Sequence, residues 1–470
     1  MSVGMSEAVD PGWAEFGRQL RFHRRRAGLT QLQLGRRVGY HHSFISRLES
    51  GLREPPFDLV SRLDAVLETG GQLATAIASP RQSLCVPGRF LTAPTLFSPI
   101  PGADTPGTEV PLAAQQWPAR LPAEGLACPL HGTAGCATPD RSSVTDLLNG
   151  LTKPYDRASE VVGAEVELLH GLTAVLACLI REAFAQVTDA CVTTVERLLR
   201  GVARWAEAVN STGRLPYGQL RLAAQYAQVS GRLRMERGQS GVAMAWFGHG
   251  LRWADAAQDA EARATLLSDM CTLVRLDGDA ASMLVYAEAI GAVDAKRRWM
   301  ATLADLYQAR AYALSHDADA CRRHVSMARR RFARLDDRDR LEAPWLSGAE
   351  GVLRLESAIG GALRDLAVMT DDRAVARRAI EATARSYALL PPMMHTTRLL
   401  LTLRLADSWA CAGDPLAAVA LAQPVLKEAV CARELMITAE LRGLHSRLAG
   451  RWGDLPEVRE YRERLWSVSE

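Results

Sequence analysis

Long apolar runs are missing from this sequence. The longest, about residues 172–180, has roughly half of the length that a membrane-spanning helix needs. The first residues, MSVGMSEAVDPGW, lack the apolar core of a secretory signal peptide. We therefore expect a soluble, cytoplasmic protein that does not bind a membrane.

Sequence motifs of catalysis are also missing. The chain has no glycine-rich phosphate loop followed by Lys and Ser or Thr, no His-Glu-x-x-His and no Gly-x-Ser-x-Gly. We interpret His316 and His324 as surface residues or hydrogen-bonded core residues. The sequence predicts a protein that is not an enzyme, and a cryptic enzyme with a helical domain stays open as an alternative.

Neither a large net charge nor a disulfide pattern is present. The formal charge is +3 over 470 residues, so nucleic-acid binding would need a local concentration of charge. The 9 cysteines are an odd number and are scattered along the chain, which fits a reducing cytosol.

Proline is sparse except in one part of the chain. Half of the 22 prolines lie between residues 74 and 140. Because proline removes a backbone donor and restricts the residue before it, neither a long helix nor a central strand can run through this part. We interpret residues 75–142 as a flexible, partly polyproline-like linker between domains at residues 13–74 and 143–470.

Residues 143–470 have apolar side chains at three- and four-residue spacing, which predicts helices. Breaks at Gly or Asp clusters precede segments that start near Gly241, Ala280 and Ala320, about 40 residues apart. Because a single helical pair cannot bury its apolar face, such pairs stack into a solenoid. The region resembles tetratricopeptide repeats with elongated helices, and a non-repetitive helical bundle stays open. The predicted fold class is all-α.

A different pattern occupies residues 31–50, QLQLGRRVGYHHSFISRLES. Two short helices that cross at a wide angle need a small residue at their contact and a residue that tolerates positive φ at the turn. Gly35 and Gly39 meet these needs, and Thr30 stands where a helix N-cap is wanted. The positions that must be apolar are Leu34, Val38, Tyr40, Ile45 and Leu48.

The motif, with the basic helical segment before it and the phrase ISRLESG–REP, resembles the Xre/Cro/cI-type helix-turn-helix regulators. The resemblance covers about residues 16–73 and implies a five-helix domain whose second motif helix enters the DNA major groove. It places His42, Ser43 and Arg47 at base-reading positions. It also places Gln31 at a phosphate contact, and we expect Arg53 to approach the DNA backbone. Phe44 either faces a thymine methyl or packs inside, and we favour packing.

Local charge agrees with this resemblance. Residues 13–56 contain nine arginines and three glutamates, so 9 − 3 gives +6, more than the whole chain carries. A basic surface of this kind is the electrostatic signature of phosphate binding.

The predicted function is a sequence-specific DNA-binding transcriptional regulator. Regulators of this type usually bind as dimers, so we expect a homodimer on double-stranded DNA. The helical repeats are expected to bind a peptide, a small ligand or a protein partner, or to dimerise. We interpret their aromatic residues mainly as core residues: Trp246, Trp253, Tyr286, Tyr307 and Tyr312. The alternative is an antitoxin-like or scaffold protein whose repeats hold a partner and whose DNA binding serves autoregulation.

The segment CPLHGTAGC places Cys128, His131 and Cys136 close together. Thiolate and imidazole ligands on short loops suit zinc, and Cys85 is the obvious candidate for a fourth ligand. Three interpretations of this cluster stay open: that it binds no ligand, that it binds zinc, or that it senses redox state or haem. We predict no other cofactor.

Overall fold

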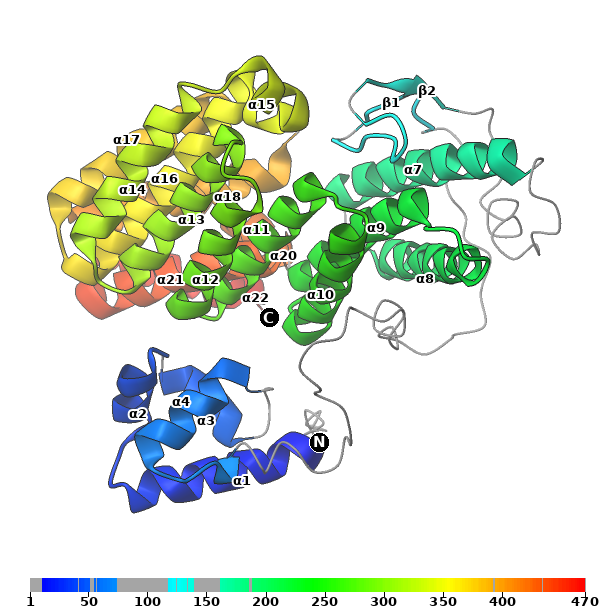
Figure 1. The fold of residues 1–470 in the computed structure, drawn as a ribbon. Coiled ribbons are helices and arrows are strands. Elements are labelled where there is room, and N and C mark those ends of the chain that lie inside the picture. The colour runs from blue at the N-terminus through cyan, green and yellow to red at the C-terminus, as the bar shows by residue number, and fades with distance from the viewer. Residues whose placement is uncertain are drawn as a thin grey trace. The chain divides into compact units, whose positions relative to one another are not determined.

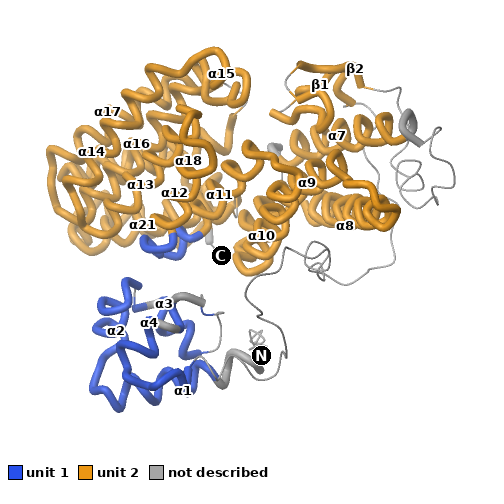
Figure 2. The backbone as a smooth tube through the Cα atoms, in the orientation of Figure 1, with its two compact units in different colours: residues 1–92, 274–282 blue, residues 93–273, 283–470 orange. Residues whose placement is uncertain are grey.

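The computed structural model describes residues 11–40, 42–50, 55, 57–73, 117–123, 125–132, 134–138, 161–185, 188–391, 394–432 and 434–469. Most of these residues are helical (Figure 1). The chain divides into two compact units, residues 1–92 with 274–282 and residues 93–273 with 283–470 (Figure 2).

The N-terminal part of the first unit, residues 1–92, contains four described helices. They are α1 (Pro11–Arg26), α2 (Gln31–Val38), α3 (His42–Glu49) and α4 (Phe57–Leu67). Their shared core contains all five apolar positions predicted for the motif, together with Phe16 and Leu20 of α1. The chain turns helical again at Gln72–Leu73, and the rest of the predicted fifth helix lies outside the described residues.

Both ends of α2 follow local rules. The Thr30 side chain accepts a hydrogen bond from the backbone N–H of Gln33, and the Gln33 side chain accepts one from the N–H of Thr30, which is a capping box. At the other end Gly39 has φ 80°, a left-handed conformation that glycine adopts without strain. The predicted N-cap and turn glycine are therefore confirmed.

Close packing of α1 on α3 depends on Gly17. A Cβ atom at this position would collide with the backbone carbonyl oxygens of Leu48 and Glu49 at the end of α3. The backbone of a helix end cannot move aside as a flexible side chain can, so only glycine allows this approach. No local pattern around Gly17 indicates this role, because it depends on a contact with residues about thirty positions later in the chain.

Part of the proline-rich region is folded. Residues 117–138 contain a two-stranded antiparallel sheet in which β1 (Arg120–Leu121) pairs with β2 (Cys136–Ala137). The Thr138 hydroxyl donates to the carbonyl of Pro118 at 2.7 Å and closes the ends of the segment. This part of the region interpreted as a linker thus contains two short strands, which the expectation of helices alone did not include, because short strands and tight turns can form between the prolines. The remainder of 75–142 lies outside the described residues.

The chain is helical after this sheet, and within this helical part residues 274–282 belong to the first unit. The helices of this part are α7 (Val161–Ala185), α8 (Asp189–Ser211), α9 (Tyr217–Glu236), α10 (Ser240–Ala256), α11 (Ala260–Leu276), α12 (Ala280–Val293), α13 (Arg298–Leu314), α14 (Ala318–Phe332), α15 (Asp337–Glu342), η2 (Pro344–Leu346), α16 (Gly348–Thr370), α17 (Arg373–Ala388), α18 (His395–Ala412), α19 (Pro415–Ala422), η3 (Gln423–Val425), α20 (Leu426–Ala432), α21 (Leu435–Trp452) and α22 (Pro456–Ser469).

Neighbouring helices of the second unit pack against each other along the chain. Extensive contacts join α8 to α9, α9 to α10, α13 to α14 and α16 to α17, and further contacts join α14 to α16 and α16 to α18. The three breaks predicted before Gly241, Ala280 and Ala320 coincide with the turns before α10, α12 and α14. Trp246 and Trp253 are fully buried, which confirms their interpretation as core residues, whereas Tyr286, Tyr307 and Tyr312 are half-buried.

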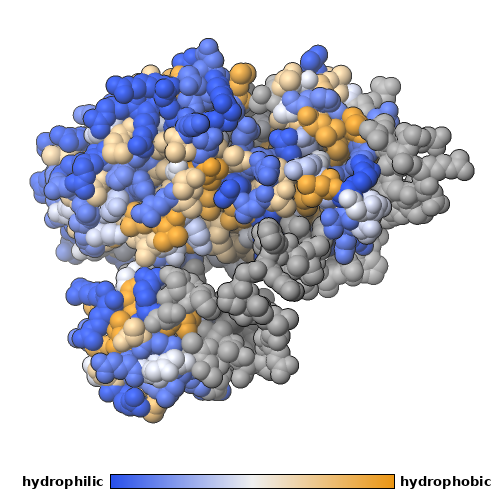
Figure 3. Space-filling view, in the orientation of Figure 1, coloured by the Kyte–Doolittle hydropathy of each residue, from blue (hydrophilic) through white to orange (hydrophobic). Residues whose placement is uncertain are grey.

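Exposed arginines cover part of this unit. In the view of Figure 3 the surface over α14 and α17 is mostly hydrophilic. The exposed arginines of these two helices are Arg322, Arg323, Arg329, Arg330, Arg373, Arg377, Arg378 and Arg385. Several of them pair with acidic residues, as Arg329 and Arg385 both do with Glu356.

One described stretch, Pro415–Ala432, could span a membrane by length and composition. It consists of α19, η3 and α20 rather than one continuous α-helix. Its residues Val419 and Leu426 belong to a hydrophobic core shared with α18, α21 and α22. We therefore interpret this stretch as core of the helical unit.

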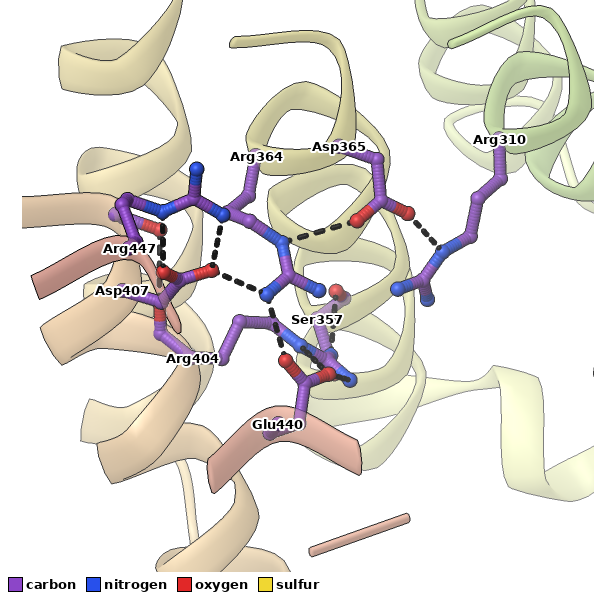
Figure 4. A network of polar contacts seen from close by, with 9 residues as sticks. Arg310, Ser357, Arg364, Asp365, Arg404, Asp407, Glu440 and Arg447 are labelled. Atoms are coloured by element: carbon purple, nitrogen blue, oxygen red, sulfur yellow. Dashed lines mark hydrogen bonds and ion pairs between the residues drawn. The ribbon is translucent and has the colours of Figure 1, made fainter. Parts of the chain in front are cut away.

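A buried ionic network joins α16, α18 and α21 (Figure 4). The guanidinium of Arg364 donates to Asp407 at 2.6 Å and to Glu440 at 2.7 Å. Arg404 donates to Glu440 at 2.9 Å, and Arg447 donates to Asp407 at 2.7 Å. Because each of these two carboxylates faces two arginines, its negative charge is compensated although it is removed from water.

Candidate nucleic-acid interface

Helix α3 has a buried side and an exposed side. Phe44, Ile45 and Leu48 are in the core of the first unit. His42 and Arg47 are exposed, and Ser46, between them, is half-buried. An amphipathic helix of eight residues thus presents polar groups on the side away from its own core.

The predicted base-reading residues lie on this helix. His42 is its first residue, and Arg47 stands in its last turn with a side chain that is 52% exposed. Ser43 follows His42 in α3, and only its backbone is described. Arg53 lies outside the described residues. Ser46 shares the exposed side, and the sequence analysis missed it.

Phe44 packs inside the domain. It is 2% exposed and its ring stacks on Tyr40 with the centroids 4.6 Å apart. The preference for packing over a thymine contact is confirmed. The guanidinium of Arg62, in α4, lies over the Tyr40 ring, with its carbon 5.6 Å from the ring centroid.

Glu49 is the polar centre of the domain, and the sequence analysis missed its role. Its carboxylate accepts hydrogen bonds from Arg24 Nε at 2.5 Å and Nη2 at 3.0 Å, and from the Gln31 amide at 2.9 Å. Burial alone would raise the pKa of the Glu49 carboxyl, but the hydrogen bonds from Arg24 and Gln31 and the charges of Arg24 and Arg21 outweigh it and lower the pKa. Glu49 therefore stays ionised and joins α1, α2 and α3.

This arrangement gives a role inside the fold to Arg24, one of the arginines counted in the basic segment, and to Gln31, the predicted phosphate contact. Arg24 is buried, and its third hydrogen bond goes to the carbonyl of Leu29 at 2.7 Å, so it serves the fold rather than the DNA. Gln31 is half-buried with its amide on Glu49. The exposed arginines of α1 and α2, which carry the basic surface, are Arg18, Arg21, Arg25, Arg26, Arg36 and Arg37.

The three linker residues Cys128, His131 and Cys136 come together with His170 of α7 in the second unit. Cys128 is fully buried and His170 is 6% exposed, whereas Cys136 is half-buried and His131 is exposed. The fourth member is thus His170, which the sequence analysis missed because it is 42 residues from Cys128. Cys85, the residue expected there, lies outside the described residues.

Burial affects the protonation of this cluster. Burial and the neighbouring Cys128 raise the pKa of the Cys136 thiol to about 11. Burial and the neighbouring His131 lower the pKa of His170. The surroundings therefore disfavour charge on both groups.

The comparisons with known proteins address the first unit. Residues 15–76 match the family described as a helix-turn-helix domain. No curated protein and no solved structure matches the chain. The matched range contains α2 and α3 with their exposed polar side, and a helix-turn-helix domain indicates DNA binding and regulation of transcription. The chain therefore carries a helix-turn-helix domain at residues 15–76, followed by a helical C-terminal region.

Proposed function

We propose that the protein is a sequence-specific transcriptional regulator of the Xre/Cro/cI type that acts in the cytoplasm and is not an enzyme. The observation that carries this proposal is the exposed polar side of α3, held on a core and an ion-pair centre that orient it. In this proposal His42, Ser43 and Arg47 read base edges, and the exposed arginines of α1 and α2 contact phosphates. Gln31 and Arg53 are proposed as further backbone contacts.

Arg47 provides the direct test. A guanidinium that donates two hydrogen bonds to a guanine discriminates against other bases by about 1–3 kcal/mol. After the bound sites are mapped genome-wide by footprinting, Arg47→Ala is expected to lose about 5- to 150-fold in affinity for the operator and to lose its preference at one base pair. Binding curves on the operator and on single-base variants measure this.

The matched control is Arg378→Ala, which removes an exposed arginine from α17 and should leave operator binding unchanged. If Arg47→Ala kept both full affinity and full preference, α3 would not be the base-reading helix.

For the helical region we propose a tetratricopeptide-like solenoid that receives a signal or dimerises. Its support is the packing of each hairpin on the next, seen also in single contacts: Gln228 of α9 donates to Asp269 of α11 at 2.8 Å, and Thr272 of α11 lies 3.1 Å from the Tyr307 hydroxyl of α13. Contacts between neighbouring pairs of this kind are what stabilise a solenoid.

An open cleft of about 380 Å³ between α13 and α14 offers a place for an anionic ligand. It is lined by four arginines, namely Arg298, Arg330, Arg331 and Arg334. A ligand or partner that binds the helical region would change operator affinity through a coupling free energy of about 1–3 kcal/mol. Operator binding by the full chain with and without anionic candidates tests this, and light scattering of the free and DNA-bound chain tests the proposed homodimer.

A further inference from the structure

Four metal-binding side chains converge in the second unit at Cys128, His131, Cys136 and His170. One ligand atom from each lies within 4.8 Å of those of the other three. Cys128 Sγ is 3.6 Å from His131 Nδ1 and 3.7 Å from His170 Nε2, and Cys136 Sγ is 3.1 Å from His170 Nδ1. In a tetrahedral zinc site with ordinary bond lengths, a sulfur and a nitrogen ligand are about 3.6 Å apart. The two distances from Cys128 Sγ, to His131 Nδ1 and to His170 Nε2, match this spacing. His170 faces the two sulfurs with different ring nitrogens, and only one of these nitrogens would bind the ion.

Three separate structural features bring these ligands together. A turn closed by the hydrogen bond from Gly132 N–H to the Cys128 carbonyl, 2.8 Å long, places Cys128 and His131 on the same side. Cys136 comes from β2, where it pairs with Leu121 of β1. His170 comes from the middle of α7.

The loop around Cys128 is also docked on α9. Arg221 donates a hydrogen bond to the carbonyl of Pro129. Gly218, beside it on the helix, lies close to the side chains of Leu130 and Leu169. Leu169 directly precedes His170 in α7, so this packing holds His170 close to the two thiols.

We propose that Cys128, His131, Cys136 and His170 bind one zinc ion with a structural role. Two thiolates and two imidazoles are ligands that favour zinc over magnesium or calcium. Four protein ligands fill a tetrahedral zinc and leave no position for a substrate, which is the property of structural rather than catalytic sites. Binding displaces the thiol protons, which leave to solvent, and involves no change of oxidation state.

The ion fastens residues 117–138 to the helical unit. This segment has a small apolar core of its own, in which Leu121, Leu126 and Cys128 are buried. Segments with so little apolar surface generally need a metal or a disulfide to hold their structure. The zinc joins the segment to α7 through His170 and supplies this missing stabilisation.

Metal analysis of the full chain tests the proposal. Purified with reductant, without chelator and after removal of any histidine tag, the protein should contain one zinc per chain. Cobalt-substituted protein should show the absorption bands of tetrahedral Co²⁺ with thiolate ligands. Failure to bind one equivalent of added zinc, octahedral cobalt bands, or a Cys128–Cys136 disulfide in place of metal would each overturn the proposal.

Variants identify the ligands. Cys128→Ser and His170→Ala should weaken zinc binding at least about tenfold, since each removes one of four ligands. Cys431→Ser and His316→Ala, both at exposed positions, should keep full zinc content. Hydrogen exchange gives a readout apart from metal content: a chelator should speed exchange in residues 117–138 and leave α13–α18 unchanged. If His170→Ala kept one zinc and an unchanged cobalt spectrum, the assignment would be wrong.

Discussion

At the scale of single residues, the DNA-binding domain depends on polar contacts as much as on its core. Arg24, Arg25 and Arg26 are adjacent in the sequence, yet Arg24 is buried on Glu49 and the other two are exposed. In the sequence alone, these three arginines form one run of basic residues and cannot be told apart. Which of them serves the fold is decided by the position of Glu49 at the end of α3.

Glu49→Ala is expected to destabilise the domain by about 3–5 kcal/mol, because it leaves the Arg24 guanidinium buried without its partner. This is comparable with the whole stability of a small domain. Hydrogen exchange of peptides within residues 16–73 measures the loss. Since the folded pKa of Glu49 is lowered, its contribution is present above about pH 4.3 and is lost as the pH falls further. Arg25→Ala on the exposed side of α1 is the control, and equal exchange in the two variants would contradict the prediction.

Glu261, in the first turn of α11, gives the helical unit a pH dependence of the opposite sign. Burial, and then the charges of Asp259 and Glu342, raise its pKa to about 7, against partial compensation by Arg221 and Arg297. The folded state therefore favours the neutral carboxyl, and stability is lost as the pH rises from about 4.3 to about 7.

Glu261→Gln should remove this loss. We expect the variant to be more stable than the parent chain by about 1–2 kcal/mol at pH 8, and equally stable at pH 4.5. Urea unfolding at the two pH values provides the measurement. Glu288→Gln, at an exposed position of α12, should change neither value. A gain of the same size at both pH values would show that charge on Glu261 is not the cause.

At the scale of helices, the buried network sets how α16, α18 and α21 pack. Asp407 is fully buried and accepts hydrogen bonds from Arg364 of α16 and Arg447 of α21. Asp407→Ala is expected to lower the free energy of unfolding by about 3–5 kcal/mol, because two arginines lose a partner inside the protein.

The control for this prediction is Arg451→Ala, which breaks the exposed ion pair with Asp371 at 2.7 Å. Exposed pairs of this kind contribute about 0–1 kcal/mol. Urea unfolding of both variants compares the buried network with this exposed ion pair. If the two substitutions lowered the free energy of unfolding by similarly small amounts, the buried network would be dispensable for helix packing.

At the scale of the whole molecule, each compact unit has its own hydrophobic core. The core of the first unit comes from α1–α4, and separate cores in the second unit come from α13–α17 and α18–α22. Because contacts within a core carry most of the cooperativity of unfolding, we expect the units to lose stability separately. In Glu49→Ala, hydrogen exchange should become faster in residues 16–73 and stay unchanged in α16–α21. In Asp407→Ala, it should become faster in α16–α21 and stay unchanged in residues 16–73. Faster exchange of α16–α21 in Glu49→Ala would contradict this.

The sequence by itself determined the parts that obey local rules. Thr30 caps α2, Gly39 ends it, and the apolar positions of α2 and α3 are buried as predicted, because capping, turn formation and amphipathic spacing act within about one or two helical turns. The breaks between the later helices follow from the same kind of rule.

Only the tertiary structure decided which distant residues meet. His170 reaches Cys128 across 42 residues, and Glu49 reaches Arg24 across 25. The folded segment at 117–138 likewise rests on contacts to α7 and α9 that its proline content conceals. Such partners depend on how whole elements pack, and no spacing within one segment encodes that packing.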